Sequence, residues 1–163
     1  MKIKVLVFAA FIGLAAVTNV FGFGLGAQFN FSAGELSAPG AAVVISPTDM
    51  THLAVNWYLD FESVNTVGLT LDVVPLTLPL AKFRAGSLNF TLGIGVYSNI
   101  TFSKHPDITG GLRIPLGFNL MLAKDVFEIY THIAPSFGVT FLPGLGLSNP
   151  FFPIALGVRF WFR

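Results

Sequence analysis

Cysteine is absent from the chain, and charged residues make up only 10% of its 163 positions. The lack of cysteine excludes disulfide bonds, thiolate metal sites and a bacterial lipid-anchor cysteine. A soluble domain contains about 25% charged residues, so the folded surface has little charge with which to face water. The formal net charge of +1 argues against a nucleic-acid partner.

The chain also has only a short apolar run at its N-terminus. Val5–Val17 spans 13 residues, whereas a membrane-spanning helix needs about 20. Two lysines precede the run and Gly22 follows it, which is the pattern of a secretory signal peptide. We therefore predict a signal peptide at residues 1–22 and an exported domain at residues 23–163. An uncleaved N-terminal anchor helix is the alternative.

Apolar residues recur instead at every second position. In residues 87–102 no residue is charged, and the odd positions carry polar or small side chains such as Asn89, Thr91 and Gly93. A period of two is typical of a β-strand, because successive side chains point to opposite faces. The even positions form an apolar face: Leu88, Phe90, Leu92, Ile94, Val96, Ile100 and Phe102.

The same alternation predicts eight strands and no helix in the exported domain. Residues 75–86 are the least regular stretch, and their two prolines cannot donate to a strand ladder, so we expect a long turn there. The second strand is nearly all apolar, which leaves its phase open. The predicted strands cover residues 23–32, 41–47, 51–62, 66–74, 87–102, 112–122, 126–141 and 151–162.

Two all-β architectures show such alternation, a soluble sandwich and a membrane barrel. The polar faces here carry too few charges for the outside of a soluble sandwich. The apolar faces are unbroken in most strands, and a tilted strand of about 9–11 residues crosses a bilayer. A sheet in hydrocarbon must close, because no water satisfies its edges. We therefore predict an eight-stranded antiparallel up-and-down transmembrane β-barrel, with its apolar face toward lipid and its polar face toward a narrow lumen.

The C-terminal third of the chain carries a family resemblance. The segments GLRIPLGFNLML, AKD, VFEIYTHIAPSF and ALGVRFWF follow one another between Gly111 and Phe162. They resemble small eight-stranded outer-membrane proteins of bacteria, the OmpA/OmpX/OmpW-like barrels, including spirochaete members. The resemblance implies a bacterial outer-membrane location with both termini in the periplasm. It also implies that the assembly machinery reads the last strand through Phe160 and Phe162, although the following Arg163 departs from the family pattern.

Charged residues on the predicted inner face are the candidate functional residues. Arg113, Glu128 and Arg159 lie on three sequential strands, which are usually neighbours, so we expect an Arg–Glu–Arg ladder. Asp60 or Asp72 is expected to reach across the interior. An orphan buried charge costs several kcal/mol, so one interpretation is a salt-bridged plug and the other is a gated passage or ligand site. The expected lumen charge network is Asp60, Asp72, Arg113, Glu128 and Arg159.

No set of catalytic or metal-ligating residues stands out. His132 and Ser136 share a face of one predicted strand but lie roughly 13 Å apart at strand rise, too far for a bond between nucleophile and base. The three histidines do not cluster at ligand spacing. We therefore predict no catalytic residue, no metal and no cofactor.

These patterns together favour a monomeric, non-catalytic outer-membrane barrel. Its predicted role is structural or surface-exposed, its lumen is filled by side chains, and its main partner is outer-membrane lipid. The alternatives are a narrow OmpW-like channel for small apolar solutes, a surface adhesin, or a barrel enzyme that modifies lipids.

Overall fold

The computed structural model describes most of residues 23–163. Asp60 and Arg163 lie outside the described residues, as does the predicted signal peptide apart from Gly22. Among the described residues, no helix is long and apolar enough to span a membrane. The described ranges are residues 22–34, 39–59, 65–103 and 106–162.

These residues form a single sheet of eleven strands, and every pairing in it is antiparallel. The predicted all-β, antiparallel class is therefore confirmed. The strands are β1 (Phe23–Gly34), β2 (Gly40–Thr48), β3 (Thr51–Leu59), β4 (Asn65–Phe83), β5 (Gly86–Phe102), β6 (Asp107–Arg113), β7 (Leu116–Leu122), β8 (Phe127–Ile133), β9 (Ser136–Leu142), β10 (Gly146–Leu147) and β11 (Phe151–Phe162).

Proline interrupts two of the predicted strands. The strand predicted at residues 112–122 is broken at Pro115, between β6 and β7, and the strand predicted at 126–141 is broken at Pro135, between β8 and β9. Proline has no N–H to donate to the ladder. A hydrogen bond still bridges the breaks, since the Ile114 amide donates to the Pro135 carbonyl oxygen at 3.0 Å. With the two-residue β10, these interruptions give eleven strands where the sequence predicts eight.

The expectation of a long turn at residues 75–86 is wrong. β4 continues through this stretch to Phe83 and pairs with β5 as far as Gly86. β3 pairs with β4 only as far as Val73, so within the described sheet the last part of β4 has a strand neighbour on one side only. An edge position tolerates proline, because a missing N–H there costs no ladder bond.

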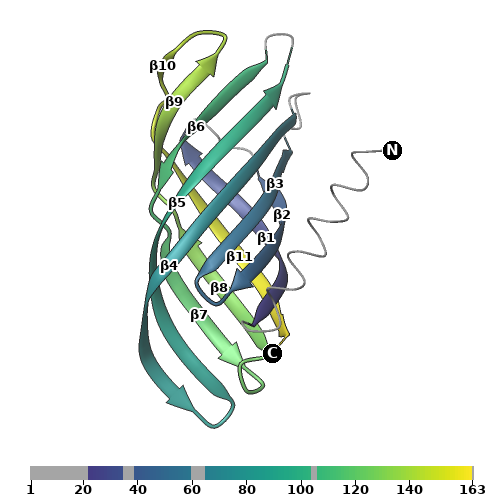
Figure 1. Ribbon diagram of the computed structural model, residues 1–163, viewed down its shortest axis with the longest axis vertical. Coiled ribbons are helices and arrows are strands. Elements are labelled where there is room, and N and C mark those ends of the chain that lie inside the picture. Colours follow the sequence, from purple (N-terminus) through teal and green to yellow (C-terminus); the bar gives the residue numbers. More distant parts are fainter. Residues whose placement is uncertain (1–21, 35–38, 60–64, 104–105, 163) are drawn as a thin grey trace, which may run out of the picture.

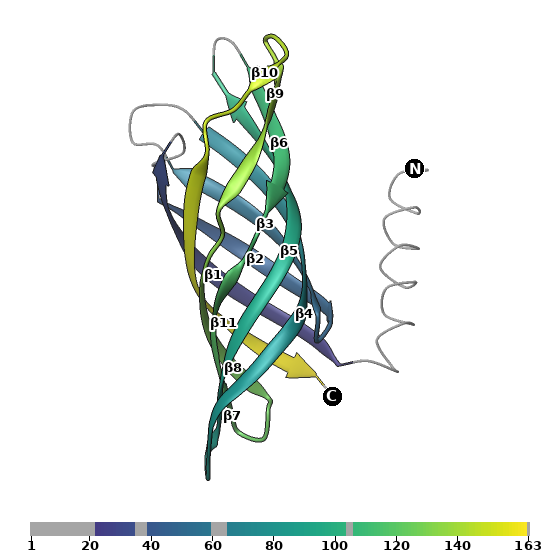
Figure 2. The ribbon, with the colours of Figure 1, turned by 90° about the vertical axis from the view of Figure 1, so that its left-hand side faces the viewer.

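The sheet curls around the long axis of the molecule (Figures 1 and 2). β1 pairs with both β2 and β11, which come from opposite ends of the chain. β5 pairs with β6 over one part of its length and with β7 over the other. β11 pairs with β8 and, at Phe151, with β9. The curl gives the sheet an inner and an outer face.

Side chains alternate between these faces, and the apolar ones point outward. Trp57 is 56% exposed, whereas the next residue, Tyr58, is 3% exposed. In β2, whose phase the sequence leaves open, Val43 is exposed and Val44 is buried. A sandwich would bury its apolar residues between two sheets. One sheet with an exposed apolar face therefore excludes the sandwich alternative.

Candidate functional site

A buried ion pair joins β8 to β11 on the inner face. Arg159 and Glu128 are ladder partners, and Arg159 Nη1 lies 3.1 Å from Glu128 Oε2. Glu128 also accepts hydrogen bonds from Trp161 Nε1 at 2.8 Å and from Asn119 Nδ2 at 2.9 Å. Because both oxygens accept hydrogen bonds and Arg159 compensates the charge, the carboxylate tolerates its burial.

A second buried pair joins strands that are not neighbours. Arg113 Nε of β6 lies 3.2 Å from Asp72 Oδ1 of β4, an ion-pair contact without hydrogen-bond alignment, and β5 runs between the two strands. Gly95 of β5 is the ladder partner of both residues. A Cβ at this position would collide with the Asp72 carboxylate. The missing side chain is therefore what lets the two charges meet.

Two flat rings connect the ion pairs. The Arg159 guanidinium lies 4.6 Å from the centroid of the Tyr130 ring. Tyr130 stacks on His132, with ring centroids 6.0 Å apart and 6° between the planes. His132 Nε2 lies 3.2 Å from Arg113 Nη2. The inner column, as we call this continuous set, consists of Glu128, Arg159, Tyr130, His132, Arg113 and Asp72.

Glycines on the neighbouring strands make room for the inner column. Gly157 is the ladder partner of Tyr130, and Gly117 is the ladder partner of His132. A Cβ at residue 157 would overlap the Tyr130 ring, and one at residue 117 would overlap the backbone of β8. Residue 157 must be glycine to make room for the Tyr130 ring, and residue 117 must be glycine because the backbone of β8 lies so close.

An amide cluster packs against the column. Asn30 Nδ2 donates to Asn56 Oδ1 at 2.8 Å, and Gln28 Nε2 donates to Asn30 Oδ1 at 2.8 Å. Tyr130 Oη donates to Gln28 Oε1 at 2.8 Å, which joins the cluster to the inner column. Side chains from β1, β3 and β8 therefore meet across the interior.

The predicted Arg–Glu–Arg ladder is wrong in its arrangement. Glu128 pairs with Arg159, but Arg113 pairs with Asp72 instead. The reason is strand stagger: Met121 is the ladder partner of Glu128, whereas Arg113 faces Ser136 further along. Asp60, the fifth residue of the expected network, lies outside the described residues. Tyr130 was not expected in the network, although its position two residues after Glu128 places it on the same inner face.

The structure also contains a serine–histidine pair that sequence reasoning missed. Ser46 Oγ lies 2.9 Å from His52 Nδ1, and the two residues flank the β2–β3 turn on the same inner face. Ser46 is fully buried, so its hydroxyl does not present a nucleophile to a substrate. Ser136, weighed as a partner for His132, donates to the Ala134 carbonyl oxygen at 2.8 Å. Within the described ranges, His, Asp and Glu side chains form no group of three suited to a metal ion.

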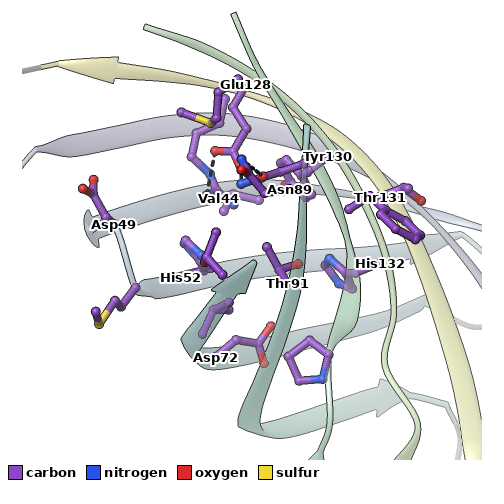
Figure 3. A pocket seen from close by; sticks show the side chains of 18 of the residues that line it. Val44, Asp49, His52, Asp72, Asn89, Thr91, Glu128, Tyr130, Thr131 and His132 are labelled. Atoms are coloured by element: carbon purple, nitrogen blue, oxygen red, sulfur yellow. Dashed lines mark hydrogen bonds and ion pairs between the residues drawn. The ribbon is translucent and has the colours of Figure 1, made fainter. Parts of the chain in front are cut away.

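A cavity of about 500 Å³ lies on the inner side near the β2–β3 turn (Figure 3). Exposed residues bound its mouth, among them Asp49 and Met50 of the turn and Thr77 of β4. The deeper lining is buried and mainly polar. It includes Gln28, Thr70, Asp72, Asn89 and Tyr130, and the half-buried His52 lies beside them.

The chain is similar to known β-barrels at the level of fold. The family model described as Protein of unknown function (DUF3996) matches residues 6–162, and nothing among the curated proteins matches. The N-terminal β-barrel domain of Pseudomonas aeruginosa OprF is 15% identical with a TM-score of 0.50, covering 86% of this chain and 97% of that chain. Neisserial surface protein A (NspA) is 12% identical with a TM-score of 0.44, covering 87% and 97%. The OprF likeness confirms the predicted resemblance to small bacterial β-barrels.

Proposed function

We propose that this chain, which belongs to the DUF3996 family of proteins of unknown function, is a bacterial outer-membrane protein with a non-catalytic, structural or surface-exposed role. The arrangement of the strands is consistent with eight transmembrane segments in a closed ring. β6 continues into β7 and β8 into β9 past their prolines, and β10 extends the end of β9. β7 also pairs with β5 along its length, and β9 meets β11 at Ser136 and Phe151, which is consistent with the closure that hydrocarbon requires.

The outer face supports contact with lipid. Trp57, Leu112 and Phe162 are 56%, 58% and 59% exposed, and they belong to strands spread around the sheet. A soluble monomer rarely exposes a contiguous apolar patch of such extent. An apolar band that surrounds a polar interior is the arrangement of a transmembrane barrel.

The remaining parts of the proposal follow the family resemblance. Residues 1–22 direct export and are removed, and the rest inserts as a monomer. The aromatic side chains of Phe160 and Phe162 point outward at the end of β11, where the assembly machinery would contact them.

The inner column is the observation that carries the non-conducting role. In each of its two ion pairs, an arginine compensates the charge of a buried carboxylate. The amide cluster packs against these pairs, so side chains fill a stretch of the interior. A path for small apolar solutes would need apolar walls. The polar inner face therefore favours the structural role over an OmpW-like channel.

Planar-bilayer recordings test this role. The refolded wild-type protein should show little or no steady conductance. An Arg159→Ala variant, which removes the side chain that pairs with Glu128 and lies over the Tyr130 ring, should show measurable current. Steady ion conductance by the wild-type protein would overturn the proposal of a filled lumen.

A further inference from the structure

We propose that the cavity beside the β2–β3 turn binds a small neutral solute rich in hydroxyl groups, such as a single sugar ring. The inference goes beyond the structural role proposed above. It depends on the geometry of the cavity alone and holds whichever membrane or compartment contains the protein.

The cavity has the size and access of a small-molecule site. Its volume of about 500 Å³ falls within the roughly 300–1,000 Å³ typical of such sites. Access follows from the unequal lengths of the strands. β3 stops pairing at Val73, while β4 runs on to Phe83, and the exposed Met50 and Thr77 on the two sides of this step both line the cavity. Pro75, which has no N–H, lies at this edge and lines the cavity.

The charges around the cavity favour a neutral solute. Asp72 and Glu128 both line it, and each is already paired with an arginine of the inner column. An added charged group would lose its hydration without gaining an uncompensated partner. The deep part of the cavity therefore offers no net attraction to an anion or a cation.

The polar groups that remain are suited to hydroxyls. Asn89 uses its Nδ2 on Asn119, at 2.9 Å, and its Oδ1 is left to accept. The Ser46 hydroxyl forms a hydrogen bond with Nδ1 of His52. The other ring nitrogen, Nε2, can therefore bond to a ligand. Thr70 and Thr91 add hydroxyl groups to the lining. Hydroxyls both donate and accept, so a polyhydroxylated ring complements such a mixed set.

A built-in fluorophore reports on the cavity. The chain has two tryptophans: Trp161 lines the cavity, and Trp57 is exposed on the outer face. The full-length Trp57→Phe protein, refolded in detergent, therefore reports emission from Trp161 alone. Titrations use glucose, glucuronate and glucosamine, which share one ring and differ in charge. We expect a saturable change with glucose and at least tenfold weaker binding of the two charged sugars.

Variants on opposite faces of the same strand locate the site. Thr91→Phe fills the cavity and should abolish the glucose response, whereas Leu92→Phe, on the outer face, should retain it. Thr70→Val removes one hydroxyl at constant shape and should weaken binding roughly threefold to tenfold, the value of one hydrogen bond. Thr70→Ser should bind like the parent. These two substitutions keep the test decisive even where Thr91→Phe fails to refold.

Three results would overturn the inference. They are the absence of any saturable response to glucose, binding of either charged sugar as tight as that of glucose, and full retention of binding in either Thr91→Phe or Thr70→Val. A preference for glucosamine would show that the acidic residues of the lining attract a cation, which contradicts selection of a neutral solute.

Discussion

Asp72 and Arg113 form their ion pair across β5, a strand to which neither residue belongs, and Gly95 lies beneath the contact. The ion pair therefore requires glycine at position 95, because a side chain there would separate the two charges. It also shows why the inner face needs glycine as well as polar residues.

Replacing Gly95 with alanine should separate this pair. The new Cβ would overlap the Asp72 carboxylate and the Leu71 carbonyl oxygen, and overpacking of this kind costs about 1–3 kcal/mol. Denaturant unfolding of the refolded protein measures the loss. Gly146→Ala is the matched control, because nothing lies within 4 Å of a Cβ there. Equal stability of the two variants would contradict the proposed role of Gly95.

The Asp72–Arg113 pair should show strong energetic coupling. Arg113→Met leaves a buried carboxylate without its cation, which costs about 3–5 kcal/mol. Adding Asp72→Asn removes that orphan charge, so the double variant should be more stable than Arg113→Met alone. A double-mutant cycle on unfolding free energies measures the coupling. Additive effects of the two substitutions would show that the contact contributes nothing specific.

Tyr130 should stabilise the folded protein through both its hydroxyl and its ring. Tyr130→Phe removes the hydrogen bond to Gln28 and should cost about 1 kcal/mol. Tyr130→Leu also removes the ring that lies between Arg159 and His132, so its unfolding free energy should fall further. Equal losses in the two variants would mean that the stacking has no energetic weight.

Sequence reasoning identifies faces better than it identifies partners. The two-residue period places Tyr58 and Trp57 on opposite faces, because the pleat alone decides it, and the shortage of charge then assigns the apolar face outward. It likewise places Arg159 and Glu128 on sequential strands, where the structure pairs them directly.

Partners depend on stagger, which the period does not encode. Arg113 and Asp72 meet only because β5 presents a glycine at the shared register position. The strand at residues 75–83 was missed because its prolines indicate a turn, whereas an unpaired edge accepts them. The Ser46–His52 pair was missed because it depends on the register across the β2–β3 turn, which the two-residue period does not give.

The end of β11 should matter for assembly in cells more than for folding in detergent. Phe162→Ala is expected to reduce the amount of protein inserted in the outer membrane, because the proposed recognition requires the outward aromatic side chain. The purified variant should still refold, as judged by heat-modifiable gel mobility. Leu156→Ala, outward in mid-strand, is the control. Equal insertion of both variants would remove the proposed role of Phe162.

Fluorescence quenching by lipids with brominated acyl chains tests whether the apolar outer face of the sheet contacts hydrocarbon. Single-tryptophan variants, Trp161→Phe and Trp57→Phe, are refolded into vesicles of these lipids. We expect strong quenching of the outward Trp57 and weak quenching of the inward Trp161. Weak quenching of Trp57, together with free access to it for aqueous iodide, would show that the apolar face does not meet hydrocarbon.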